Sequence, residues 1–106
     1  MDFNRYITAA EFAPLAELFR TEGHSRIYLP GEAFARQDER NPCCGLVTGG
    51  AFRYVHLTAE GNASVVGYAF SGEFVGDYIS MSNGLRSWVG IEAMCRSSVS
   101  CLDYGR

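Results

Sequence analysis

Two nearby turns carry the residues best suited to binding chemistry: segment 71–77 (SGEFVGD) and segment 83–87 (NGLRS). Gly76 can adopt a positive φ or let a ligand approach the backbone, and the N–H groups that follow Asp77 can turn inward on an anion. Arg86 offers phosphate oxygens a charge-assisted contact, and the Asp77 carboxylate can accept hydrogen bonds from ribose hydroxyls. The pattern predicts a phosphate-binding loop between residues 76 and 87.

Each of these residues also has an ordinary structural interpretation. Arg86 can be a solvated charge in an exposed turn, and Asp77 can cap the turn that follows it by accepting backbone N–H bonds. Trp88 is expected to lie in the core or in an interface rather than to form a platform for a nucleobase. The sequence leaves these alternatives open.

Metal, redox and nucleophile chemistry find little support elsewhere in the chain. His24 and His56 are isolated, without the His-x-His or Glu-x-x-His spacing of a metal site. The four cysteines have no Cys-x-x-Cys spacing, and we expect reduced thiols that act mainly as small buried apolar side chains. We therefore expect no metal site, no required cofactor and no enzymatic activity.

The composition is that of one ordinary globular domain. The chain has 106 residues, of which 47% are hydrophobic and 20% charged, so one packed core is expected over residues 1–106. Its formal net charge of −3 disfavours contact with a polyanion, so direct DNA binding is not expected. Neither a signal peptide nor an apolar stretch long enough for a membrane helix is present, which indicates a cytoplasmic protein without membrane contact.

Short β-rich runs follow a single amphipathic helix. The helix is expected over about 8–22, beginning at Thr8 or closer to Phe12, with Gly23 as its stop. Turn dipeptides then divide the chain into eight expected strands. These strands lie near 25–29, 34–37, 43–48, 51–58, 63–70, 74–76, 88–94 and 98–103. Eight short strands after one helix predict a mainly β fold, a double-stranded β-helix or jelly roll with an N-terminal helix.

Several weak motifs in this order resemble the cyclic-nucleotide-binding domain of Crp/Fnr-type bacterial transcription regulators. Segment 28–34 (YLPGEAF) resembles the opening hairpin of that domain, and 49–53 (GGAFR) resembles its middle hairpin. Segment 72–77 (GEFVGD) resembles the entrance of its phosphate-binding cassette, and 91–93 (IEA) the strand after it. The resemblance covers about residues 25–103.

The resemblance implies a ligand-sensing roll in which Gly76 and Asp77 line the pocket and Arg86-Ser87 hold a cyclic phosphate. The family normally has Glu where Asp77 stands, a small residue where Trp88 stands, and a loop one residue longer. An alignment without a gap places Ser87, instead of Arg86, on the phosphate ligand's position. Family members also carry a dimerising helix and a DNA-reading helix-turn-helix, which are not expected within these 106 residues.

Two functions are therefore predicted. The first is the sensor domain of a Crp/Fnr-like regulator, with a small-molecule effector that is a cyclic nucleotide or another phosphorylated compound, in a parent protein that forms homodimers. The alternative is a β-roll with an empty cassette that serves as a protein-interaction or dimerisation module. The aromatic side chains expected to form its partner-facing surface are Tyr54, Tyr68, Phe70, Tyr78 and Trp88.

Overall fold

The computed structural model describes residues 9–40, 43–77 and 85–103. Its elements, in chain order, are α1 (Ala9–Glu22), β1 (His24–Tyr28), β2 (Ala33–Ala35), β3 (Cys43–Gly49), β4 (Ala51–Leu57), β5 (Ala63–Phe70), β6 (Phe74–Val75), β7 (Gly90–Ala93) and β8 (Ser97–Asp103). Each of the eight predicted strands is present, and most bounds agree to within a residue or two. The helix begins at Ala9, so the start near Thr8 agrees better than the start near Phe12, and Pro14 lies inside it.

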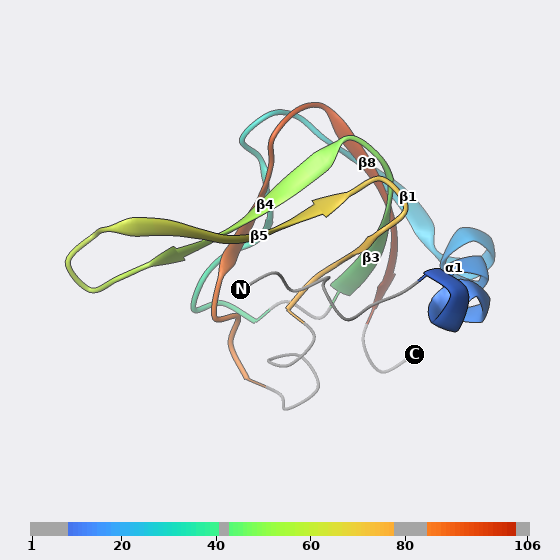
Figure 1. The fold of residues 1–106 in the computed structure, drawn as a ribbon, viewed down its shortest axis with the longest axis horizontal. Coiled ribbons are helices and arrows are strands. Elements are labelled where there is room, and N and C mark those ends of the chain that lie inside the picture. The colour runs from blue at the N-terminus through green and yellow to red at the C-terminus, as the bar shows by residue number, and fades with distance from the viewer. Residues whose placement is uncertain (1–8, 41–42, 78–84, 104–106) are drawn as a thin grey trace.

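The strands form two antiparallel four-stranded sheets, in the orders β1-β8-β3-β6 and β2-β7-β4-β5. The sheets face each other across the core, and the β4–β5 hairpin extends away from the body of the roll (Figure 1). This is the jelly roll that the strand pattern predicts. Some strands that are far apart in the chain pair with each other: β1 pairs with β8, and β2 pairs with β7.

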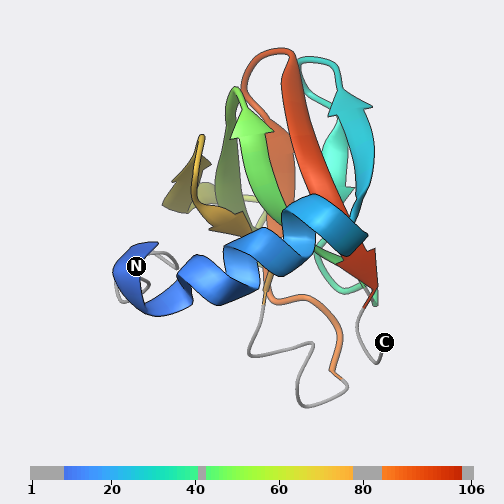
Figure 2. The same cartoon turned by 90° about the vertical axis from the view of Figure 1, so that its right-hand side faces the viewer.

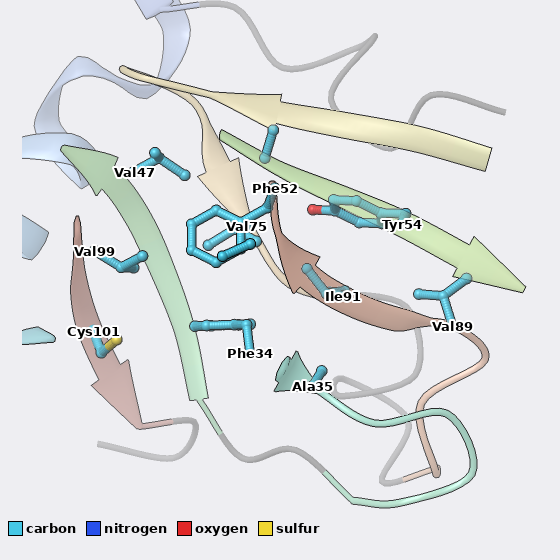
Figure 3. Close-up of a cluster of buried hydrophobic side chains, with 12 residues drawn as sticks. Phe34, Ala35, Val47, Phe52, Tyr54, Val75, Val89, Ile91, Val99 and Cys101 are labelled. Atoms are coloured by element: carbon cyan, nitrogen blue, oxygen red, sulfur yellow. The ribbon is translucent and has the colours of Figure 1, made fainter. Parts of the chain in front are cut away.

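The main core lies between the two sheets and is drawn in Figure 3. Its buried members are Phe34, Ala35, Val47, Phe52, Tyr54, Ala69, Val75, Val89, Ile91, Ala93, Val99 and Cys101. Side chains along β4 alternate between the core and the surface: Phe52 and Tyr54 face inward with no exposed surface, whereas Arg53 between them is exposed. Strand β4 thus contributes the two largest fully buried side chains of the described residues.

A second cluster attaches α1 to the outer face of the first sheet. Phe19 packs edge-on against Phe74 with ring centroids 5.2 Å apart, and Leu46 completes the buried set. The helix crosses in front of β3 and β8 (Figure 2). It ends at Gly23, whose N–H donates to the Phe19 carbonyl, as the predicted stop requires. A Cβ at Gly23 would collide with that carbonyl and with Ser100, so only glycine permits this close approach.

The cysteines differ in their exposure. All four are free thiols; Cys101 is buried, Cys43 and Cys44 are half-buried, and Cys95 is exposed. The expectation of small buried apolar side chains is therefore wrong for Cys95, which lies in the exposed turn between β7 and β8. A hydrogen bond with Cys43, together with burial, raises the pKa of the Cys101 thiol far above its usual range.

Candidate ligand-binding site

The predicted loop leaves the roll at the end of β6 and returns to it before β7. Its first end is Gly76-Asp77, directly after β6, and its second end is the segment 85–89 that leads into β7. Residues 78–84 lie outside the described part of the chain, and Tyr78, one of the predicted surface aromatics, is among them. The chemistry that can be described is therefore that of the two ends of the loop.

Gly76 is held by a tyrosine from the opposite sheet. The Gly76 N–H donates to the Tyr54 hydroxyl at 3.1 Å, and that hydroxyl approaches the Gly76 carbonyl at 3.4 Å. Gly76 has a φ of 147°, a conformation that L side chains rarely adopt, so a glycine is required here as the motif predicts. Tyr54 is fully buried, and its assignment to a partner-facing surface is wrong: the inward alternation of β4 points it into the core.

Asp77 joins the two ends of the loop. Its carboxylate is 3% exposed and accepts the Trp88 N–H at 2.8 Å. The Ser87 hydroxyl lies 3.5 Å from the same carboxylate oxygen, but it lies closer, at 2.7 Å, to the Val89 carbonyl. Because a hydroxyl has one proton to donate, the bond to Val89 dominates and the Trp88 N–H is the stronger partner of Asp77. This bond resembles the capping role left open by the sequence, although the donor, Trp88, lies eleven residues after Asp77.

Arg86 turns to a different part of the molecule. Its guanidinium donates to the Asp38 carbonyl at 2.9 Å, in the connection between β2 and β3. The backbone on both sides supports this contact, because Ser87 N–H donates to the Glu39 carbonyl and Asp38 N–H donates to the Ser87 carbonyl. The structure thus brings Gly76, Asp77 and Ser87 to one place, while Arg86 is exposed and attached to the neighbouring connection.

An aromatic pair lies beside the second end of the loop. Trp88 is 45% exposed, which contradicts the core alternative and leaves its predicted place in an interface untested, and its indole stacks on His56 with ring centroids 4.3 Å apart. His56 follows Tyr54 by two positions along β4. Neither aromatic partner of the loop, Tyr54 or His56, was assigned to the site from the sequence. The available signal was the alternation of Phe52, Tyr54 and His56 along the strand, although the register of β4 shifts between Tyr54 and Val55.

Gln37, from the opening-hairpin motif, has a structural function. Its side-chain amide donates to the Leu57 carbonyl at 2.9 Å and accepts the Leu57 N–H at 2.8 Å. This pair of bonds imitates a strand partner and connects the segment after β2 to the end of β4.

Two surface hollows lie elsewhere on the described residues. One, of about 550 Å³, has charged side chains in its lining: Arg26, Glu32, Arg36 and Glu92. The other, of about 320 Å³, lies over Gly90 on the outer side of the second sheet. Glu92 forms an ion pair with Arg53, with 2.5 Å between the Glu92 Oε1 and the Arg53 Nη2. In the described ranges no group of His, Cys, Asp and Glu side chains could hold a metal ion, and no helix there is long and apolar enough to cross a membrane.

No protein-family model matches this sequence. No curated protein matches it either.

Solved structures show the same fold. A c-di-GMP-responsive global regulator from Xanthomonas campestris is 22% identical, with a TM-score of 0.78 over 89% of this chain and 45% of its own. The catabolite activator protein of Thermus thermophilus is 20% identical, with a TM-score of 0.70 over 92% of this chain and 44% of its own. A mutant regulatory subunit of a cAMP-independent protein kinase A from Trypanosoma brucei, bound to cAMP, is 20% identical, with a TM-score of 0.69 over 76% of this chain and 29% of its own.

The chain therefore spans less than half the length of each of these three proteins. The similarity confirms the fold predicted from the motifs: this chain has the jelly roll of the cyclic-nucleotide-binding domains found in Crp/Fnr-type regulators and kinase regulatory subunits. All three are regulatory proteins by name.

Proposed function

We propose that this chain is a ligand-sensing regulatory domain, the sensor of a Crp/Fnr-like bacterial transcription regulator. The ligand is a cyclic nucleotide or another small phosphorylated compound, bound between Gly76-Asp77 and Arg86-Ser87. The observation that carries the proposal is the buried Asp77 carboxylate, which holds together the two ends of the loop that leaves after β6 and returns before β7. A loop closed in this way can respond to a ligand as a unit.

Ser87, Asp77 and Arg86 each contact the ligand in a different way. Ser87 offers a hydroxyl next to Asp77, and the Asp77 carboxylate, with about four acceptor positions, accepts a ligand hydroxyl beside the Trp88 N–H; both Ser87 and Asp77 are 3% exposed. Arg86 must exchange the Asp38 carbonyl for a phosphate oxygen. Its guanidinium is exposed, so that exchange costs little, and a charge-assisted contact contributes about 1.5–3 kcal/mol.

Regulation then follows from a difference in the ligand's affinity for two arrangements of the loop. A ligand that binds one arrangement of the loop more tightly shifts the population toward it, and the shift is transmitted to whatever the roll contacts. The net charge of −3 assigns DNA reading to another part of the parent protein, which we propose to be a cytoplasmic homodimer. The roll itself needs no cofactor and catalyses no reaction in this proposal.

A thermal-shift screen tests the proposal. The purified domain is heated with cAMP, cGMP, c-di-GMP, ribose 5-phosphate and inorganic phosphate, and any stabilising compound is titrated by calorimetry. A ligand at about a hundred times its dissociation constant stabilises the fold by about 2.7 kcal/mol, which is several degrees in a domain of this size.

Arg86→Ala is the diagnostic variant, with Arg20→Ala as its matched control. Arg20 is also an exposed arginine, and its ion pair among the described residues is with Glu17 of the same helix, so its loss removes one positive charge from α1. We expect tenfold to hundredfold weaker binding, about 1.5–3 kcal/mol, in the first variant only. Equal affinity in both variants removes Arg86 from the site, and a screen without any stabilising compound contradicts the sensor proposal.

A second candidate function rests on the outer face of the β4–β5 hairpin. Tyr68 and Phe70 stack there with ring centroids 5.8 Å apart while remaining 41% and 52% exposed. Strand β5 is an edge strand of eight residues without a charge or a proline, and such edges readily pair with another strand. The partner that fits this strand is a second copy of β5.

Light scattering distinguishes this dimerisation module from the sensor. We expect a concentration-dependent dimer that Val65→Lys on β5 abolishes, whereas Leu18→Lys on α1 preserves it; both positions are about half exposed. A wild-type domain that stays monomeric over the concentration range contradicts the second candidate.

A further inference from the structure

The contact between Tyr54 and Gly76 has the geometry of an occupied binding position. Gly76 N–H is a backbone donor of the proposed cassette, and its partner is the Tyr54 hydroxyl at 3.1 Å. The same hydroxyl lies 3.4 Å from the Gly76 carbonyl, so both backbone polar groups of Gly76 have the Tyr54 hydroxyl as their described partner. A ligand that uses this N–H must first remove the phenol.

Removing the phenol carries a cost that a ligand must offset. Tyr54 has no exposed surface, and its ring is a member of the main core beside Val75, Val89 and Ile91 (Figure 3). Displacing it exposes a large aromatic side chain or forces the core to repack, and it leaves the hydroxyl to find a new partner. The Tyr54 ring therefore fills the space on the core side of Gly76.

We infer that Tyr54 determines ligand specificity by occupying the interior beside Gly76, so that the domain selects small phosphorylated compounds over nucleotides with a base. A sugar phosphate can reach the exposed Arg86 without moving the ring. A nucleotide whose base or ribose enters the roll at Gly76 meets the buried phenol. This inference rests on the proposed sensor function and names the ligand class of that site.

A purely structural tyrosine is the alternative, since buried tyrosines normally find a hydrogen-bond partner. Stability alone does not separate the two, because truncation of Tyr54 lowers the melting temperature in either case. The ratio of the affinities for ribose 5-phosphate and cAMP separates the two alternatives, because replacing a core residue without influence on the site leaves that ratio unchanged.

The experiment measures ribose 5-phosphate and cAMP binding by calorimetry in wild type, Tyr54→Val and Tyr28→Val. Tyr28 is the matched control: its ring packs against Phe34 and Phe52 in the same core, but the strand that carries it is β1. We expect wild type to prefer ribose 5-phosphate, and Tyr54→Val to gain about tenfold or more in cAMP affinity, a change of about one decade in dissociation constant. Tyr28→Val keeps the wild-type ratio.

Tyr54→Phe supplies a second variant that retains the ring and so the core. It removes the hydroxyl from the Gly76 N–H but keeps the ring in place, so we expect wild-type affinity for ribose 5-phosphate and unchanged discrimination against cAMP. Wild type that binds cAMP as tightly as Tyr54→Val overturns the inference while leaving the sensor function in place. If no variant binds either probe, the proposed function falls and this inference falls with it.

Discussion

Replacing Asp77 by alanine tests whether its carboxylate holds the two ends of the loop together. The side chain is 3% exposed and accepts the Trp88 N–H at 2.8 Å, with the Ser87 hydroxyl at 3.5 Å as a weaker contact. Alanine leaves the Trp88 N–H without this acceptor. The Ser87 hydroxyl keeps its bond to the Val89 carbonyl, so among residues 9–40, 43–77 and 85–103 the strong hydrogen bond that is lost is the one from the Trp88 N–H.

The magnitude follows from that single bond. A hydrogen bond to a charged group contributes about 1.5–3 kcal/mol, so we expect a loss of about 2 kcal/mol. An unfolding entropy of about 2.1 cal/mol/K per residue, over 106 residues, converts this to a melting temperature about 9 °C lower. Asp77→Asn retains an acceptor oxygen without the charge, and about half that decrease is expected.

Scanning calorimetry measures both variants, with Glu60→Ala as the control because Glu60 lies in the exposed turn of the β4–β5 hairpin. The control is expected to stay within about 0.5 kcal/mol of wild type. Amide hydrogen exchange supplies a local readout, since the Trp88 N–H should exchange faster in Asp77→Ala than in the control. An Asp77→Ala domain that melts with the wild type, with Trp88 equally protected, refutes the argument that this carboxylate closes the loop.

Two further predictions concern the fold. Gly50→Ala and Gly61→Ala both place alanine at a positive φ, 81° and 87°, but only at position 50 would the Cβ meet backbone, 2.7 Å from the Ser97 Cα. We expect about 1 kcal/mol lost at Gly61 and distinctly more at Gly50 in urea unfolding; equal losses would contradict the packing argument. Burial raises the pKa of Tyr28 above 10.0, and a Cys43 hydrogen bond with burial raises the pKa of the Cys101 thiol above 9.0. A group whose pKa is higher in the folded than in the unfolded state contributes its full stabilisation below the unfolded-state pKa and loses it as the pH rises through the folded-state pKa. We therefore expect the melting temperature to fall from about pH 9 upward, and to fall less in the double variant Tyr28→Phe/Cys101→Ala.

The strands were predictable because their signals are local. Strand β5 was expected at 63–70 and is observed at Ala63–Phe70, since the turns on both sides contain glycine and the residues between them favour strand. The disagreements occur where a side chain or backbone group binds outside its own strand. The strand expected over 88–94 begins at Gly90, because Trp88 N–H goes to Asp77 instead of a neighbouring strand.

The candidate site was predictable as a set of residue types and only in part as an arrangement. The sequence alone indicated a jelly roll, a glycine at position 76 that needs unusual backbone freedom, and a carboxylate at 77 with a structural or a ligand-binding function. Only the tertiary structure decided that Tyr54 contacts Gly76 and that Arg86 contacts Asp38. These pairs are 22 and 48 residues apart in the chain. The packing of one sheet against the other brings Tyr54 to Gly76, whereas the pairing of β2 with β7 in one sheet brings Asp38 to Arg86. Local propensity sets where a strand begins and ends, whereas the packing of the whole roll sets which side chains its loops meet.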